Sequence, residues 1–190
     1  IHQLVAKAEA EGRTPLIIGE AHHPEVLAAA SRSPHSVILE GPEELEKWLA
    51  ERPERREMPL LAVAQTTCIQ TIWQNAQKIL KKECTNAEIF DTICLATHKR
   101  QTEAAELAAK VDVMVVVGDR KSANTKHLTE ISRLRCPTVY QIEGAEELNV
   151  DFLKGCSVAG LTAGASTPAG IIKEVYATMS DEIKTMEATE

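Results

Sequence analysis

The residue most able to do chemistry in this sequence is a cysteine, Cys94, which lies in the segment 91–101 (DTICLATHKRQ) at an abrupt change of local pattern. A polar stretch precedes the segment, and a helical pattern follows it, with Ala104, Leu107 and Ala108 on one face. A reactive thiol at such a junction can be shielded, oriented and still reachable. The alternative is a small hydrophobic side chain buried under the start of a helix, because unbridged cysteines are among the most buried residue types. The segment alone leaves both interpretations open.

Two loops carry side chains that could move protons. In the loop GEAHHPEV, His23 and Glu25 flank Pro24, which fixes the local turn. A histidine supplies a cation or a proton donor near neutral pH, and a carboxylate two residues further on could relay a proton. The alternative is an exposed polar loop. In the loop QTTC, the hydroxyl groups of Thr66 and Thr67 could bridge a carboxylate and a ligand, or could cap the next helix.

Two further loops have the residue types of an anion site. GDRKSANTKHL follows an apolar run; Gly118 permits a sharp turn, and Ser122 and Asn124 stand at the entry to a helix. The unpaired N–H groups and positive dipole end of a helix favour an anion there, although Ser and Asn also serve as ordinary N-caps. TAGASTPAG repeats the arrangement with Gly164 and Ser166, and its small residues let a ligand approach the backbone closely. Together the loops predict a phosphate or diphosphate site, and neither is a Walker loop or a GxGxxG fingerprint.

The composition excludes several classes of protein. The chain has 190 residues, 44% of them hydrophobic and only 3% aromatic, which favours a core of Val, Ile, Leu and Ala in α/β layers. A net charge of -7 argues against a broad nucleic-acid interface. No apolar run is long enough to cross a bilayer and no leader pattern stands at the start, so we expect a cytoplasmic protein. The cysteines are irregularly spaced without a CxxC pair, unlike a disulfide framework or a closed zinc site.

Short apolar runs alternate with helical patterns along the chain. This rhythm is typical of α/β proteins whose parallel sheets are covered on both faces and bind ligands at the carboxyl ends of the strands. We expect strands at 14–19, 36–39, 60–64, 111–118, 138–142 and 156–162. We expect helices at 1–12, 24–31, 41–51, 71–82, 91–110, 125–134, from about 145, and at 168–179. The charged segment 51–59 is predicted to be a connector with nothing to bury.

The two halves of the chain have a similar rhythm, which predicts two small α/β domains with mostly parallel sheets, 1–90 and 91–190. The helical pattern is already under way at Ile1, so the chain is expected to be cut from a longer one. The tail from about residue 180 is predicted to be frayed.

Five segments occur in the order of one known family. They are HPEV at 23–26, QTT at 65–67, DTICLATHKRQ at 91–101, VVVGDRKSANTKHL at 115–128 and TAGASTP at 162–168. Each is modest alone, but five in order span nearly the whole chain and are highly specific. On these motifs the chain resembles the 4-hydroxy-3-methylbut-2-enyl diphosphate reductases (the LytB family), which catalyse the last step of the non-mevalonate isoprenoid pathway.

The resemblance implies an oxidoreductase that converts this allylic diphosphate to isopentenyl and dimethylallyl diphosphate. Family members bind a [4Fe-4S] cluster through three cysteine thiolates where three α/β domains meet, and reduced ferredoxin or flavodoxin would be the electron donor. By resemblance, Cys94 is the third cluster ligand and Thr97 lines the cavity near the cluster. Such a cluster can pass electrons one at a time, while a nearby acid protonates the departing hydroxyl.

The remaining roles also come from the resemblance. His23 would contact the substrate, Glu25 would deliver protons, and Thr66 would help to link Glu25 to the substrate hydroxyl. The substrate diphosphate would be held by Ser122, Asn124 and Ser166. Neither a nucleic acid nor a membrane is implied as a partner.

Two departures from the family pattern bear on activity. Ala123 stands at the second serine of the family's SSN motif, which removes one hydroxyl contact at a cost of about 0.5–1.5 kcal/mol. The family's first domain is absent, and with it the first cluster cysteine, while the second is expected just upstream of Ile1. No matching motif contains Cys68, Cys84, Cys136 or Cys156. We therefore expect a truncated reductase that is inactive alone and retains no cluster; the alternative is a diphosphate-binding, non-catalytic paralogue or module.

Overall fold

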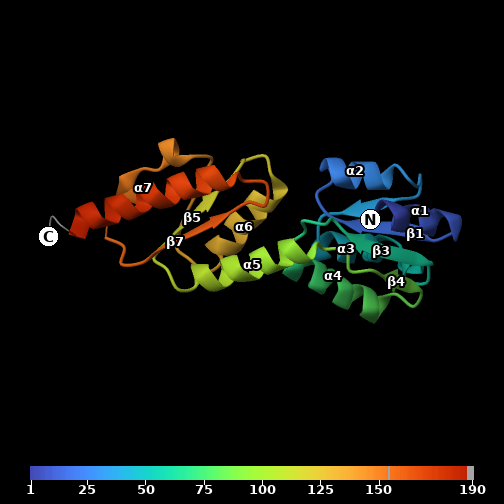
Figure 1. Ribbon diagram of the computed structural model, residues 1–190. Helices are drawn as coiled ribbons and strands as arrows, with labels where there is room; N and C mark the ends of the chain where they lie inside the picture. The colour runs from blue at the N-terminus through green and yellow to red at the C-terminus, as the bar shows by residue number, and fades with distance from the viewer. Residues whose placement is uncertain (154, 188–190) are drawn as a thin grey trace. The chain divides into compact units, whose positions relative to one another are not determined.

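The computed structural model describes residues 1–153 and 155–187. The chain divides into two compact units, Ile1–Leu95 and Ala96–Glu190, and each alternates strands with helices (Figure 1). Every strand pair in the described residues is parallel, which confirms the predicted α/β class. The predicted domain boundary near residue 90 stays a prediction.

Unit 1 is a four-stranded parallel sheet in the order β2-β1-β3-β4, with helices on both faces. Successive residues of β1 point to opposite faces, as strand geometry requires. Leu16 therefore joins Trp73 in the cluster under α3 and α4, whereas Ile17 joins Val26 in the cluster under α1 and α2. The elements are α1 (His2–Ala10), β1 (Thr14–Ile18), α2 (Pro24–Ala30), β2 (Val37–Leu39), α3 (Pro42–Glu51), η1 (Pro53–Arg56), β3 (Leu60–Ala64), α4 (Gln70–Glu83) and β4 (Ala87–Ile89).

Unit 2 is a three-stranded parallel sheet in the order β6-β5-β7. All five residues of the central strand β5 are buried, because a strand covered on both faces is apolar throughout. Val115 faces the cluster that includes Val175 of α7, and Met114 faces the cluster that includes Leu128 of α6. The elements are α5 (Leu95–Ala108, which begins at the last residue of unit 1), β5 (Val113–Val117), α6 (Ala123–Arg133), β6 (Thr138–Ile142), η2 (Ala145–Glu147), η3 (Val150–Leu153), β7 (Ala159–Ala163) and α7 (Ala169–Glu187).

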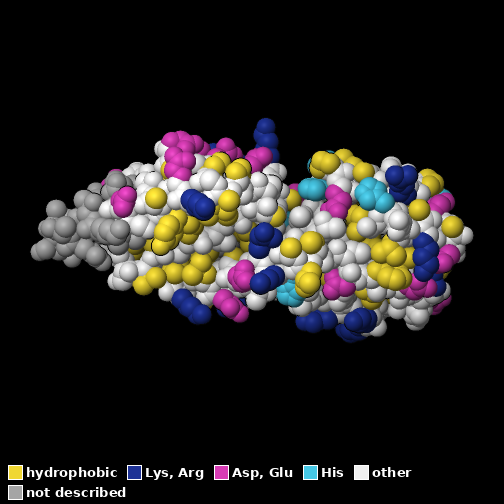
Figure 2. Space-filling view, in the orientation of Figure 1, with side chains coloured by type: hydrophobic (Ala, Val, Ile, Leu, Met, Phe, Trp, Pro, Cys, Tyr) yellow, Lys and Arg dark blue, Asp and Glu magenta, His cyan; other side chains and the backbone are white. Residues whose placement is uncertain are grey.

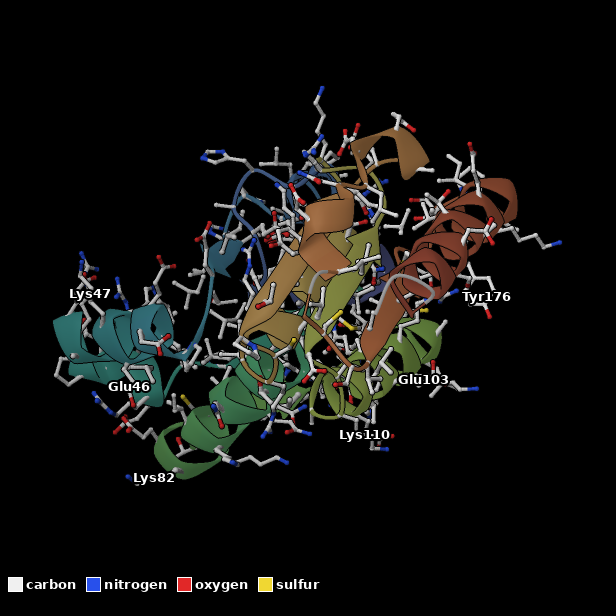
Figure 3. All side chains as sticks on the ribbon, turned by 90° about the vertical axis from the view of Figure 1, so that its left-hand side faces the viewer. Glu46, Lys47, Lys82, Glu103, Lys110 and Tyr176 are labelled. Carbon is white, nitrogen blue, oxygen red and sulfur yellow. The ribbon has the colours of Figure 1, made fainter. Side chains whose placement is uncertain are left out.

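The helices present charged residues to solvent and apolar residues to the sheets. On α3, Leu45 is buried, whereas Glu46 and Lys47 point outward, as does Lys82 on α4 (Figure 3). On α7 the outward face carries Tyr176, which is also labelled in Figure 3. Among the described residues, no helix combines the length and apolar character needed to span a bilayer.

Three sequence predictions about elements are wrong. β4 was not predicted, because its three residues are too short to show a strand pattern; it pairs with the first half of β3. In place of an acidic helix from about 145 there are two 3-10 turns, because the side chain of Asn149 accepts a hydrogen bond from Asp151 N at 2.9 Å and interrupts the helix. The predicted helix end near Met179 is too early: α7 continues to Glu187, and no Gly or Pro after Gly170 stops it.

The connector 51–59 also has more structure than predicted. It contains the turn η1, and the guanidinium groups of Arg55 and Arg56 donate to the carbonyl oxygens of Trp48 and Leu49 at the end of α3. Met58 packs against the neighbouring hydrophobic cluster. Residues 188–190, the end of the tail predicted to be frayed, lie outside the described range.

Candidate functional site

Glu25 and Thr66 are joined in unit 1 by two hydrogen bonds. Thr66 donates to Glu25 Oε2 from its backbone N–H at 3.1 Å and from its hydroxyl at 3.0 Å. The carboxylate is half-buried, and Thr66 engages only one of its two oxygens. A carboxylate held by two donors keeps one orientation, which a group that passes protons to a bound molecule requires.

Parallel pairing of β1 and β3 brings these side chains together, because Glu25 lies in the first turn of α2, the helix that follows β1, and Thr66 follows β3. His23 fixes the start of α2: its Nδ1 accepts a hydrogen bond from Glu25 N at 3.2 Å, and Pro24 occupies the first helical position. That cap uses one ring nitrogen of His23. The proton is therefore assigned to Nε2, the nitrogen that remains to donate to a ligand.

Gln65 is a residue of this site that the sequence reasoning missed. It is 0% exposed; its Nε2 donates to Thr67 Oγ1 at 2.8 Å, and its Oε1 accepts from Glu20 N at 2.9 Å. It therefore ties the loop after β3 to the loop after β1. A glutamine directly after the apolar run LLAVA was the available signal, because a buried polar side chain needs partners.

Cys94 is exposed, so the interpretation of it as a buried core residue is wrong. Its backbone N–H donates to Thr66 O at 3.0 Å, which places the Cys94 backbone beside the loop that holds Glu25. Thr92 fixes the same segment, because its hydroxyl donates to Ala64 O at 2.5 Å and accepts from Ala64 N at 2.9 Å. Four residues singled out from the sequence thus belong to one group of loops in unit 1: His23, Glu25, Thr66 and Cys94.

The cysteines of this chain do not fit a whole iron-sulfur cluster. In the part of the chain that the structure describes, no three His, Cys, Asp or Glu side chains are grouped to hold a metal ion. Burial raises the pKa of Cys68 to about 12, which disfavours the thiolate that binds iron. Cys84 and Cys136 are also buried, and the Cys156 thiol donates to Leu153 O at 2.9 Å. One exposed thiol, that of Cys94, can supply one ligand.

The start of α6 has the features of an anion site. Ser122 caps the helix, with its Oγ accepting from Thr125 N at 3.5 Å. Asn124 is 5% exposed, and in the described residues neither its amide nitrogen nor its amide oxygen has a hydrogen-bond partner. Burying such a group unpaired costs about 1–3 kcal/mol. A ligand at this N-terminus would satisfy the amide, and the helix dipole there favours an anion.

Ser166 is exposed and lines a cavity of about 180 Å³ in unit 2. The same cavity carries two carboxylates, those of Asp119 and Glu143. Arg120 offsets part of this charge: its guanidinium lies 4.0 Å from Glu143 Oε2 and bonds Glu147 at 2.5 and 3.0 Å, and its backbone N–H donates to Glu143 Oε1 at 2.9 Å. Figure 2 shows acidic side chains gathered in this part of unit 2. An anion could therefore be held on the Ser166 side and not across the whole cavity.

The structure brings Ser122, Asn124 and Ser166 to the same edge of one sheet. The loops that carry them follow β5 and β7, which are neighbours and parallel, so both loops leave the carboxyl edge. Thr97, the fourth residue predicted in unit 2, is buried in the first turns of α5 and does not line the Ser166 cavity. Its predicted place near a cluster stays a prediction.

These features define the class of the protein: an α/β protein with an oriented carboxylate and an exposed thiol in one unit and a helix N-terminus suited to an anion in the other. Comparison with known proteins identifies the family. The family model described as "LytB protein" matches residues 1–180, and the chain belongs to this family.

Several relatives and solved structures are similar to the chain. It is 37% identical over 91% of its length to the 4-hydroxy-3-methylbut-2-enyl diphosphate reductase of a Nitratiruptor species, and spans 61% of that protein. It is 36% identical to the reductase of the same name from Caldanaerobacter subterraneus, of which it spans 59%. The structure of the Plasmodium falciparum E-1-hydroxy-2-methyl-but-2-enyl-4-diphosphate reductase matches with a TM-score of 0.84 and 26% identity, over 93% of this chain and 55% of that one. The chain thus spans about 60% of the curated relatives.

Proposed function

We propose that this chain is the middle and C-terminal part, domains 1–90 and 91–190, of a reductase that removes the hydroxyl group from 4-hydroxy-3-methylbut-2-enyl diphosphate. The products would be isopentenyl and dimethylallyl diphosphate. Membership of the LytB family supports the reaction class, because the relatives carry that enzyme name. The observation that carries the proposal for this chain is the buried, unpartnered amide of Asn124 at the start of α6, which indicates an anionic ligand.

In this proposal the loops of unit 1 handle the proton. Glu25 would donate a proton to the departing hydroxyl, and Thr66 would hold the carboxylate and pass its hydroxyl hydrogen bond on to the substrate. The Nε2 of His23 would donate to the substrate, since Nδ1 already caps α2. Glu25 is half-buried, which leaves it reachable for a substrate.

The loops of unit 2 would hold the diphosphate. Ser122 would donate its hydroxyl proton and Asn124 its amide N–H groups at the positive end of α6, and Ser166 would add a third donor from the loop after β7. A diphosphate oxygen accepts such hydrogen bonds more strongly than a neutral group does, because it is charged. Ala123 lacks the hydroxyl that the family pattern has at this position.

A [4Fe-4S] cluster would supply the electrons in the complete enzyme, with reduced ferredoxin or flavodoxin as the donor to it. Cys94 is the residue of this chain that we propose as one of its ligands, and Thr97 would lie nearby. Because the other cysteines do not fit the role, we propose that this chain alone retains no cluster and has no reductase activity. Reductase activity of the 190-residue chain after anaerobic iron and sulfide reconstitution would contradict this.

The anion site can be tested by titrating pyrophosphate into the 190-residue chain in a calorimeter. Removing one hydrogen bond to a charged group costs about 1.5–3 kcal/mol, so Asn124→Ala and Ser166→Ala should each weaken binding about tenfold or more. Ser157→Ala is the matched control, because Ser157 is exposed and precedes β7, whereas both loops follow the opposite ends of β5 and β7. Equal affinities of the unmodified chain and the three variants would contradict the proposed anion site.

A second candidate function is a diphosphate-binding module that never carried the cluster, as a non-catalytic paralogue. The alanine at position 123 favours it, since one expected hydroxyl is missing. Reading the gene upstream of the codon for Ile1 separates the two. A cysteine codon a few residues upstream, and another near the start of the full gene, support the reductase. A start codon at this position supports the module.

A further inference from the structure

We infer that Thr125 is a positioning residue that sets the spacing between the two anion-binding loops of unit 2. This inference rests on the proposed function, since those loops carry Asn124 and Ser166. Thr125 directly follows Asn124 in the first turn of α6 and is 0% exposed. Its side chain lies against Gly118, the residue that follows β5, and against Gly164, the residue that follows β7.

The contact with Gly118 leaves no room for a larger residue. A Cβ atom at Gly118 would stand 2.7 Å from Thr125 Oγ1 and 2.7 Å from Thr167 Oγ1. Gly118 also has φ +147, a backbone conformation that L side chains rarely adopt. Two separate reasons therefore require glycine at this strand end.

At Gly164 the steric effect of Thr125 can be separated from any requirement of the backbone for glycine. Gly164 has no positive φ, so backbone conformation does not require glycine there. A Cβ atom at Gly164 would instead collide with Thr125 Oγ1, and the next nearest atom, Thr167 Oγ1, would be 3.3 Å away. Gly164 thus makes room for Thr125, a contact that the sequence interpretation of this loop, close approach of a ligand to its small residues, did not include.

The hydroxyl of Thr125 is not explained by hydrogen bonding. Its Oγ1 is buried and has no hydrogen-bond partner in the part of the chain that the structure describes. A partnerless buried hydroxyl is unfavourable for stability. The oxygen lies against the two glycines that follow β5 and β7, so its effect is to set how far the first turn of α6 stands from these two strand ends.

Both loops continue directly from this contact to the proposed ligand-binding residues. Gly164 N donates to Val117 O at 2.9 Å, and the Thr167 hydroxyl donates to the same oxygen at 3.0 Å, which ties the β7–α7 loop to the end of β5. These hydrogen bonds already fix the distance between the two strand ends, so trimming Thr125 would instead let the first turn of α6 move toward Gly118 and Gly164. Ser166 would then move relative to Asn124, and a ligand could no longer bond both well.

The test uses the 190-residue chain, pyrophosphate calorimetry and a thermal melt of each variant. Thr125→Ala removes Oγ1 and should weaken pyrophosphate binding about fivefold, the equivalent of one misaligned hydrogen bond, without a matching loss of thermal midpoint. Thr125→Ser keeps Oγ1 and should bind within about twofold of the unmodified chain. Unchanged affinity in Thr125→Ala, or equal losses in the alanine and serine variants, would overturn the inference.

A double-mutant cycle tests the contact itself. Gly164→Ala should lower both affinity and thermal midpoint, because its new Cβ meets Thr125 Oγ1. Adding Thr125→Ala should restore the midpoint, so that the two effects are not additive. Gly170→Ala is the matched control, since a Cβ there meets nothing within 4 Å. Additive losses in the double variant would show that Thr125 is not the obstacle and would overturn the inference.

The failure of the proposed function can be told apart from the failure of this inference. If the unmodified chain does not bind pyrophosphate, the anion site fails, and the spacing role is then judged by amide hydrogen exchange. Thr125→Ala should speed exchange in both loops, around Ser122 and around Ser166, relative to Thr125→Ser. Exchange that is unchanged in either loop would overturn the role of Thr125 whatever the ligand.

Discussion

Replacing Gln65 by leucine should destabilise unit 1 by about 2 kcal/mol, because leucine has a similar volume but replaces neither of its two hydrogen bonds. The side chain is fully buried, with bonds of 2.9 Å from Glu20 N and 2.8 Å to Thr67 Oγ1. Each neutral bond contributes about 1 kcal/mol, and the groups left behind lose their partner. The loops that carry Glu25 and Thr66 should loosen together, since Gln65 joins them.

Urea unfolding followed by tryptophan fluorescence measures this loss of stability in unit 1. The chain has two tryptophans, Trp48 and Trp73, and both lie in unit 1, so the signal reports that unit without a contribution from unit 2. With a slope of about 2 kcal/mol per molar urea, the midpoint should fall by about 1 M.

Gln74→Leu is the control for the Gln65 prediction, because Gln74 is exposed on α4 and a surface change stays within about 0.5 kcal/mol. If Gln65→Leu moves the midpoint no further than this control, Gln65 does not hold the two loops together.

Three other outcomes are expected. A thiol reagent should modify Cys94 in the fastest phase of the reaction, and Cys94→Ser should remove that phase. The pKa of Cys68 is about 12, so about one part in ten thousand of it is thiolate near pH 8, and it should react only when the chain unfolds. Arg120 lowers the pKa of Glu147, so the ion pair stabilises unit 2 at neutral pH, and this stabilisation is lost as the pH falls through the Glu147 pKa. Glu147→Gln should therefore reduce the decrease of the thermal midpoint on the acid side of its pH profile at low salt. An unchanged profile would contradict this. Anaerobic iron and sulfide reconstitution followed by desalting should leave substoichiometric iron and no cluster absorption.

Local pattern was enough to predict most of the fold. Runs such as LLAVA and VMVVV are buried along their whole length, and a run of this kind has few alternatives to a central parallel strand. Two of the three wrong predictions concern a short element or depend on one side chain. β4 is too short to show a period, and the turn made by Asn149 replaces a helix that the acidic composition favoured.

Residue types alone could not decide how the site is assembled. The hydrogen bond from Thr66 to Glu25 depends on the pairing of β1 with β3, and the place of Cys94 beside the same loop depends on its backbone hydrogen bond to Thr66 O. The number of residues between two positions in the sequence does not show whether they are neighbours in the fold. The predicted roles of Thr97 and of the cluster ligand stay predictions.

The sequence by itself determined the α/β class, the family and the loops that bear polar residues, because strand period and motif order are properties of the chain read in one dimension. Only the tertiary structure decided that Gln65 and Thr125 join those loops. The Gln65 side chain bonds the loop after the neighbouring strand β1, and the Thr125 side chain lies against the glycines that follow β5 and β7; that adjacency arises when the parallel sheets form. The same adjacency explains the lack of a side chain at Gly118 and Gly164, because a Cβ atom at either position would meet Thr125 Oγ1.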